Sequence, residues 1–422
     1  MTMNRRALLQ ALGLAGTLGL LPLSRSGWAA IAPGAVTAPA PRLIVIMLRG
    51  AVDGLNVVVP YAEDNYYRLR ESIAIAKPGQ DGGALDLDGR FGLHPALSSL
   101  MPLWQSKQLA FVHAAGSPDP TRSHFDAQDY MESGTPGRKG TVDGWMNRLL
   151  GNLTPPHSAI LDAVSLGPVL PRIFSGENTV ANVPLGRAAT RAIALDKPAV
   201  AAAFDRLYAD AGDLGAAYRE GRKSHEQILA DLSSEPVSME SKVADNGAPP
   251  PQGFSLDAAQ LATLIQRNPG LQLAFMQLGG WDTHVNQGGS QGQLANRLRP
   301  LAEGLVTLTT QLGPQLANTM IVVMSEFGRT AKQNGTGGTD HGHGNVMWLL
   351  GGRVNGGKVH GEWPGLDDSA LNERRDLAVT TDFRSVLSTV CERHMGLKDA
   401  AMASVFPGLP AATSGVAQLI RS

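Results

Sequence analysis

The hydrophobic residues of the chain gather in a few dense runs, with segments of helical spacing between them. The first run, RLIVIMLRG at 42–50, is rich in aliphatic and β-branched residues and predicts a strand that is buried on both faces. Three similar runs follow at 109–116, 271–280 and 318–329, and each ends in glycine and polar residues. Because helical segments separate the runs, we expect them to be strands of one mostly parallel sheet.

Seven segments have the apolar spacing of helices, and several begin with serine, threonine or aspartate at a plausible N-cap. They cover residues 94–107, 123–133, 141–151, 200–232, 255–268, 290–313 and 381–396. A polar stretch at 234–254, rich in proline and glycine, predicts a long surface loop rather than a domain boundary. The strands on both sides of it have the same character, so we expect a single α/β domain over residues 42–422.

The first thirty residues predict a targeting segment rather than part of the fold. Residues 1–30 have a basic start, an apolar middle and small residues at the end. The apolar part, residues 11–23, is too short and too rich in glycine to span a bilayer comfortably. Residues 31–41 are rich in proline and alanine and predict a tether, so we expect no stable membrane span after cleavage.

The details of this segment favour twin-arginine export over the general secretory route. Arg5 and Arg6 are followed by apolar residues, and Arg25 lies just before the expected cleavage near Ala29 or Ala30. The expected partner during export is therefore the twin-arginine translocase, and the expected destination is the periplasm or the exterior.

Composition narrows the class of protein. The chain has 422 residues, a formal net charge of −1, 43% hydrophobic residues and 17% charged residues, as in an ordinary globular protein. This charge balance gives no indication of a nucleic-acid partner. Cys391 is the only cysteine and lies in a segment of helical spacing, so we expect a buried core residue and no intramolecular disulfide.

Residues suited to chemistry collect after the apolar runs, and in an open α/β sheet ligands bind beyond the carboxyl ends of the strands. Asp53 follows the first run, Ser123 and His124 the second, Asp282 and His284 the third, and Glu326 the fourth, with Asp340, His341 and His343 in DHGH about a dozen residues later.

Each of these residues has a simple structural explanation when taken alone. Asp53 before a glycine fits a turn, Glu326 fits an exposed strand end, and Asp340 fits a turn cap. Together, carboxylate oxygens and imidazoles form the ligand set of zinc, manganese or a similar divalent ion, and the residue types do not distinguish zinc, manganese, magnesium and calcium. The predicted metal ligands are Asp53, Asp282, His284, Glu326, Asp340, His341 and His343.

Ser123 and His124 are the catalytic candidates. Ser123 stands where a helix begins, and a hydroxyl at a helix N-terminus beside metal ions can become a nucleophile, although an ordinary N-cap serine is the alternative. His124 fits a metal ligand, an acid–base group or a packing histidine. Arg49, Arg122 and Arg329 flank these motifs and are candidates for binding an anion, with structural ion pairs as the alternative.

The stretches LRGAVDGLN, RSHFDAQ, GWDTHVNQ, SEFGRT and DHGHG occur in this order behind the arginine pair. In this combination the chain, from about residue 42 onward, resembles the bacterial domain-of-unknown-function 1501 family, whose members are related to the alkaline phosphatase and sulfatase superfamily. The resemblance implies an alkaline-phosphatase-like three-layer sandwich with a mostly parallel central sheet, and one or two divalent ions at its carboxyl edge.

By position, the resemblance implies that Asp53 is the carboxylate after the first strand and that Ser123 is the nucleophile. It implies that Asp282 and His284 are the ligand pair of one metal. His341 and His343 resemble the histidine that completes the site late in the superfamily's sequence. The spacing departs from the superfamily, because the pair reads Asp-x-His here rather than Asp-x-x-x-His. After the fourth strand the superfamily has Asp-His, whereas this chain has Glu326 and Phe327. One imidazole is therefore missing, and His124 could take its place. No Cys-x-Pro-x-Arg stretch surrounds Ser123, so formylglycine chemistry is not expected.

These observations predict an exported metal-dependent hydrolase that acts on a phosphate or sulfate ester of a small molecule or polymer through a di-metal-type site. The alternative is a non-catalytic exported binding protein that keeps the fold and a structural metal.

Replacement of both Arg5 and Arg6 by lysine should leave the precursor in the cytoplasm, because a receptor reads the arginine pair rather than hydrophobicity alone. Cell fractionation and immunoblotting measure this outcome. Unchanged export of the double variant would assign the chain to the general secretory route.

Overall fold

The computed structural model describes residues 40–153, 161–185, 198–208, 215, 218–219, 222, 243–410 and 414–421. The chain divides into two units, Met1–Ala38 and Pro39–Ser422, and the described residues all belong to the second. The predicted export signal, most of the predicted tether and parts of the segments at 200–232 and 234–254 lie outside the described residues.

The main sheet has nine strands in the described part of the chain, in the order β11-β5-β10-β9-β1-β8-β6-β7, and β12 also pairs with β5. Their bounds are β1 Arg42–Leu48, β5 Leu109–Gly116, β6 Ala163–Leu166, β7 Ala181–Val183, β8 Leu273–Leu278, β9 Thr319–Ser325, β10 Asn345–Gly351, β11 Lys358–His360 and β12 Thr381–Asp382. All residues of the central strand β1 are buried, as its continuous apolar run predicts.

One strand of this sheet, β10, runs against its neighbours. It pairs antiparallel with both β9 and β5, whereas the other pairings between the strands of the main sheet are parallel. The amino end of β10 therefore lies at the same edge as the carboxyl ends of the other strands. The loop before β10 and the loops after β1, β5, β8 and β9 all reach this edge.

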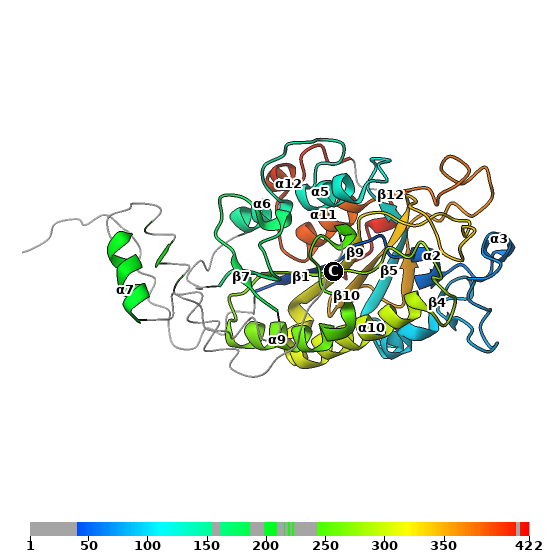
Figure 1. Cartoon of the computed structure of the whole chain (residues 1–422), viewed down its shortest axis with the longest axis horizontal. Coiled ribbons are helices and arrows are strands. Elements are labelled where there is room, and N and C mark those ends of the chain that lie inside the picture. The colour runs from blue at the N-terminus through cyan, green and yellow to red at the C-terminus, as the bar shows by residue number, and fades with distance from the viewer. Residues whose placement is uncertain are drawn as a thin grey trace, which may run out of the picture. The chain divides into compact units, whose positions relative to one another are not determined.

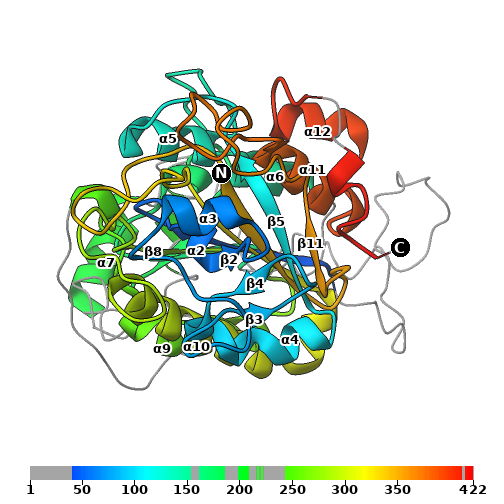
Figure 2. The same ribbon diagram turned by 90° about the vertical axis from the view of Figure 1, so that its right-hand side faces the viewer.

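Helices cover both faces of the sheet (Figures 1 and 2). One face packs against α5 His124–Ser133, α6 Trp145–Asn152, α11 Phe383–Arg393 and α12 Asp399–Val405. The other packs against η1 Pro95–Leu100, α4 Met101–Gln105, α9 Phe254–Arg267 and α10 Gln293–Leu312. Alternate side chains of β1 enter the two cores, Leu43, Val45 and Met47 in one and Ile44, Ile46 and Leu48 in the other. The three-layer α/β sandwich with a mostly parallel sheet is confirmed.

The remaining elements are short. A second sheet has the order β2-β4-β3, with β2 Val58–Val59, β3 Leu85–Asp86 and β4 Gly92–Leu93. The other helices are α2 Gly54–Val57, α3 Asp64–Leu69, η2 Arg172–Phe174, α7 Pro198–Leu207, η5 Val243–Asp245, η6 Pro251–Gly253, η7 Gly313–Asn318 and η8 Ser414–Val416. Within the described part of the chain, no helix combines the length and apolar character that a membrane span requires.

The strands predicted from the four apolar runs are confirmed as β1, β5, β8 and β9. The helices predicted at 123–133, 141–151, 255–268, 290–313 and 381–396 are confirmed with end shifts of a few residues, and the segment at 94–107 divides into η1 and α4. Cys391 is fully buried in α11, as expected, and burial raises the pKa of its thiol.

Candidate metal centre

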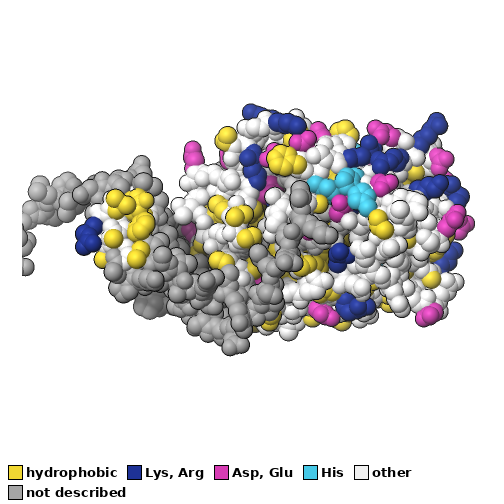
Figure 3. All heavy atoms as spheres, in the orientation of Figure 1, with side chains coloured by type: hydrophobic (Ala, Val, Ile, Leu, Met, Phe, Trp, Pro, Cys, Tyr) yellow, Lys and Arg dark blue, Asp and Glu magenta, His cyan; other side chains and the backbone are white. Residues whose placement is uncertain are grey.

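The loops at the carboxyl edge bring the candidate residues together. His124 is the first residue of α5, which follows β5, while Asp282 and His284 lie in the loop between β8 and α10. Residues 326–344 connect β9 to β10, and a bridge between Arg329 and His341 extends this hairpin beyond the sheet. Histidine side chains form one patch on the face drawn in Figure 3.

Three imidazoles and one carboxylate converge at this edge. Nε2 of His341 lies 2.9 Å from Nε2 of His124 and 3.0 Å from Nε2 of His284. The carboxylate oxygens of Asp282 lie 3.1 Å from Nε2 of His284, 3.3 Å from Nε2 of His341 and 3.6 Å from Nε2 of His124. The ligand atoms of His124, Asp282 and His341 all lie within 4.8 Å of one another. We call these four residues the His–Asp cluster.

The second ring nitrogen of each histidine contacts an oxygen of the protein. Nδ1 of His124 lies 2.7 Å from Oε1 of Glu326, and Nδ1 of His284 lies 3.1 Å from Oδ1 of Asp340. Nδ1 of His341 lies 2.8 Å from the backbone carbonyl oxygen of Arg122. Because these oxygens accept hydrogen bonds, each Nδ1 carries the proton and each Nε2 directs a lone pair to the centre. Three facing lone pairs repel one another unless a proton or a metal cation lies between them.

The electrostatics of the cluster favour a positive charge. Burial by itself would lower the pKa of His124, but the neighbouring carboxylates of Asp282 and Glu326 raise it to about 9. Burial also opposes ionisation of Asp282, yet the imidazoles of His124 and His341 and the charge of Arg329 hold the pKa of that carboxyl well below its usual range. A raised pKa favours a proton on His124, and in the metal-free protein this proton would lie between the rings of His124 and His341, where a metal ion would take its place.

Glu326 and Asp340 orient two of the imidazoles through Nδ1 and are not members of the cluster. Glu326 is fully buried and accepts hydrogen bonds from His124 and from Nε2 of Gln128 at 3.0 Å. Burial alone would raise the pKa of Glu326, but these two hydrogen bonds lower it. Asp340 accepts from His284 in the same way. In metal sites, the ring nitrogen of a histidine that does not bind the ion typically donates a hydrogen bond to a carboxylate or carbonyl oxygen of this kind.

Two other expected ligands, Asp53 and His343, are engaged elsewhere. Asp53 is fully buried, and its oxygens accept hydrogen bonds from Arg70 at 2.5 and 3.0 Å and from Nε2 of Gln287 at 2.6 Å. Nε2 of His343 lies 3.0 Å from the carbonyl oxygen of Ser117, and its buried Nδ1 has no hydrogen-bond partner in the described structure.

Ser123 is the N-cap of α5. Its side chain is exposed, and its hydroxyl oxygen accepts a hydrogen bond from the backbone N–H of Asp126 at 3.4 Å. The adjacent residue, His124, is the one whose side chain enters the cluster. Ser123 therefore caps α5, while the imidazole of His124 faces the cluster.

The three arginines expected to bind an anion pair with carboxylates of the protein. Each guanidinium lies 2.6–2.7 Å from its partner, and the pairs are Arg49 with Glu132, Arg122 with Asp376 and Arg329 with Asp282. Arg49 and Arg329 are almost completely buried. Arg329 acts on the cluster directly, because its charge stabilises the Asp282 carboxylate.

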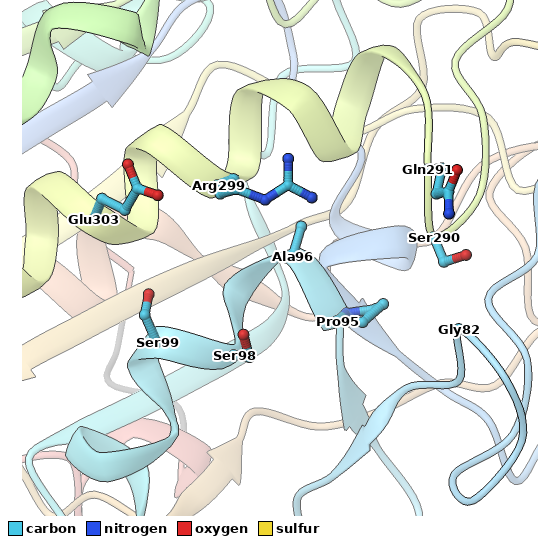
Figure 4. A pocket seen from close by; sticks show the side chains of 9 residues that line it. All are labelled: Gly82, Pro95, Ala96, Ser98, Ser99, Ser290, Gln291, Arg299 and Glu303. Atoms are coloured by element: carbon cyan, nitrogen blue, oxygen red, sulfur yellow. The ribbon is translucent and has the colours of Figure 1, made fainter.

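A separate cleft of about 390 Å³ lies between η1 and α10 (Figure 4). It is lined by Gly82, Pro95, Ala96, Ser98, Ser99, Ser290, Gln291, Arg299 and Glu303. Since this lining contains none of the candidate ligands, the cleft and the His–Asp cluster are different places.

Sequence reasoning placed His124 with the catalytic candidates and did not single out Gln128, Arg70 or Gln287. His124 and His341 are 217 residues apart, and they meet because β5 pairs with β10. Helical spacing is a signal that could have found Gln128, since it lies four residues after His124 and so shares its face of α5.

The structure defines an α/β protein with a partly exposed His–Asp cluster at the carboxyl edge of a mostly parallel sheet. The family model described as "Protein of unknown function (DUF1501)" matches residues 89–406, well over half of the chain, and the chain belongs to this family. No curated protein matches the sequence significantly.

Several solved structures are similar to the chain over most of its length. The PsFucS1 sulfatase from Pseudoalteromonas sp. has 14% identity, with coverage of 91% of this chain and 74% of that chain and a TM-score of 0.41. The C-terminal periplasmic domain of EcEptC from Escherichia coli has 10% identity, coverage of 89% of each chain and a TM-score of 0.39. A protein in the alkaline phosphatase superfamily from Vibrio parahaemolyticus has 10% identity, coverage of 77% and 64% and a TM-score of 0.34.

Substitution Ser123→Ala should lower the free energy of unfolding by an amount at the lower end of about 0.5–2 kcal/mol, because a helix cap with a long hydrogen bond is lost. The metal content should stay at the wild-type value. The control variant Ser123→Thr keeps a capping hydroxyl and should have nearly wild-type stability. Chemical denaturation and elemental analysis measure the two quantities. Loss of metal from Ser123→Ala would instead make Ser123 part of the metal site.

Proposed function

We propose that the His–Asp cluster binds a divalent metal ion and that the protein is an exported hydrolase of phosphate or sulfate esters. The observation that carries this proposal is the approach of Nε2 of His341 to Nε2 of both His124 and His284, while the Nδ1 atom of each ring contacts an oxygen acceptor. Neutral imidazoles held in this way are the form that binds metals.

The ligand atoms of the His–Asp cluster favour some metal ions over others. Imidazole nitrogens together with one carboxylate suit zinc or another transition metal, whereas magnesium and calcium prefer oxygen ligands. Among the four ions considered from the sequence, zinc fits these residues best. The charge of the cluster also favours a cation, because the pKa of Asp282 is well below its usual range and the pKa of His124 is raised.

A bound metal ion would polarise the ester and offset its negative charge. In the proposed enzyme His124, His341 and Asp282 hold the ion, and Glu326 keeps the ring of His124 in the orientation that binding requires. His284 is the most exposed of the three imidazoles, with 39% of its side chain accessible, compared with 13% for His124 and 25% for His341. His284 therefore stands on the solvent side, where it can move a proton during ester hydrolysis.

The remaining parts of the proposal concern location and substrate. We propose that the arginine pair of residues 1–30 directs export by the twin-arginine route and that the protein works in the periplasm or outside the cell. The proposed substrate is an anionic ester of a small molecule or a polymer. Export of this kind fits a protein that acquires its fold before it crosses the membrane.

A non-catalytic metal protein is the second candidate, and two observations favour it. Three histidines and one aspartate fill a tetrahedral zinc site, whereas catalytic zinc sites keep one position open. The three arginines beside the site are already paired with carboxylates of the chain. In this version the ion stabilises the carboxyl edge or a binding surface, and the purified protein turns over neither an aryl phosphate nor an aryl sulfate.

Substitution His341→Ala should abolish stoichiometric binding of zinc, because His341 contacts every other member of the cluster. His343→Ala is the matched control, since the same residue type two positions away contacts Ser117 instead. We expect His343→Ala to retain the metal. Elemental analysis of protein from the exported fraction measures both, and equal metal content in the two variants would contradict the proposed centre.

Substitution His284→Ala separates the enzyme from the non-catalytic protein. If His284 moves protons, the variant should keep its metal and lose most turnover of an aryl phosphate or aryl sulfate. If His284 is the fourth ligand of a closed site, the metal itself should be lost. Metal content and hydrolysis rate, measured on the same preparation, distinguish the two cases.

A further inference from the structure

A buried polar network lies beneath the His–Asp cluster, and Gln287 is at its centre. The side-chain oxygen of Gln287 accepts hydrogen bonds from the hydroxyls of Thr283 at 2.7 Å and Thr339 at 2.8 Å. All three side chains are at most 1% exposed. Thr283 stands between the cluster residues Asp282 and His284, and Thr339 lies two residues before His341. A single amide thus links the two loops that carry three of the four cluster residues.

The other end of the same amide reaches a third loop. Nε2 of Gln287 donates to the carboxylate of Asp53, which follows β1 and pairs with the buried guanidinium of Arg70. Arg70 also donates to the carbonyl oxygens of Thr330 and Ala331 in the β9–β10 hairpin, at 2.9 and 3.0 Å. Gln287 is therefore held against a fixed, fully buried ion pair.

The network continues from Thr339 to the cluster. Nε of Arg329 donates to the hydroxyl of Thr339 at 3.1 Å, and Nη1 of the same guanidinium donates to Asp282 at 2.6 Å. A backbone hydrogen bond from Thr339 to the carbonyl oxygen of Thr283, at 3.2 Å, runs beside these contacts. A displacement of either threonine hydroxyl would therefore move groups that touch the ligand atoms.

We propose that Gln287 is a positioning residue that sets the separation of the two ligand loops and thereby the affinity of the His–Asp cluster for its metal. The inference rests on the proposed metal site, but it concerns residues that do not touch the ion. Outer residues that orient metal ligands typically change metal affinity roughly 10–100-fold when they are replaced. Gln287 acts through the threonines, and the Asp53–Arg70 pair serves as its anchor.

Glutamine suits this position because it offers both a donor and an acceptor. Its oxygen receives two hydroxyl protons, while its N–H faces an ionised carboxylate. Glutamate would place a second carboxylate against Asp53, and methionine of similar shape would leave Asp53, Thr283 and Thr339 without these partners.

The test compares zinc affinity with stability in four variants of the mature protein. Thr283→Val removes only the hydroxyl that Gln287 binds, whereas Thr283→Ser keeps a hydroxyl at this position. Gln287→Met removes the hydrogen bonds to both threonines and to Asp53. Asn147→Ala is the control, because Asn147 is also buried and bonded, to Phe174 and Asn178, in a different part of the fold. Zinc affinity is measured by competition with a chelator, and the thermal midpoint is measured on the metal-free protein.

We expect Thr283→Val and Gln287→Met to bind zinc roughly 10–100-fold more weakly than the wild type, and Thr283→Ser to bind it with nearly wild-type affinity. Asn147→Ala should lower the thermal midpoint without a change in zinc affinity. The inference is overturned if Gln287→Met and Thr283→Val lose stability like Asn147→Ala but bind zinc as the wild type does. Failure of the wild-type protein itself to bind zinc is a different result, and it would refute the proposed function.

Discussion

The loops at the carboxyl edge depend on one buried ion pair, between Asp53 and Arg70. Both side chains are fully buried, and removal of either partner would leave an uncompensated charge, at a cost of about 3–5 kcal/mol. Since Arg70 also binds two carbonyl oxygens of the β9–β10 hairpin, the pair joins the loop after β1 to the segment that carries His341. Asp53, the one acidic residue of LRGAVDGLN, therefore stabilises the loops of this edge.

The glycines around DHGHG have a steric explanation. A side-chain carbon at Gly328 would lie 1.9 Å from the carbonyl oxygen of Gly344, across the hairpin. At Gly338 it would lie 2.3 Å from the carbonyl oxygen of His284, in the neighbouring loop. The two loops approach each other so closely that no other residue fits, and this proximity is what brings His284 beside His341.

Features that a short stretch of sequence encodes could be predicted, whereas features that depend on contacts between distant residues could not. The long buried strands were predictable because their apolar runs are continuous, and the sheet edge followed from their parallel order. The strand β10 was not predicted, since nothing local in NVMWLLGG encodes that it runs antiparallel between β5 and β9. Residue type alone does not separate Asp282 from Glu326 and Asp340. All three are carboxylates near histidines, and only their distances in the structure distinguish contact with Nε2 from contact with Nδ1.

The four residues of the His–Asp cluster lie far apart along the chain, and this distance affects when they can meet during folding. His124 and His341 are 217 residues apart, while His284 and His341 are 57 apart. Closure of such long loops costs entropy before any contact in the cluster offsets it, so we expect these pairings to form late in folding. A chain that has formed β8, β9 and β10 but has not yet docked β5 lacks His124. The four side chains of the cluster therefore come together only in a chain whose sheet is complete across these strands, and binding of the proposed metal ion would mark the end of folding rather than guide its beginning.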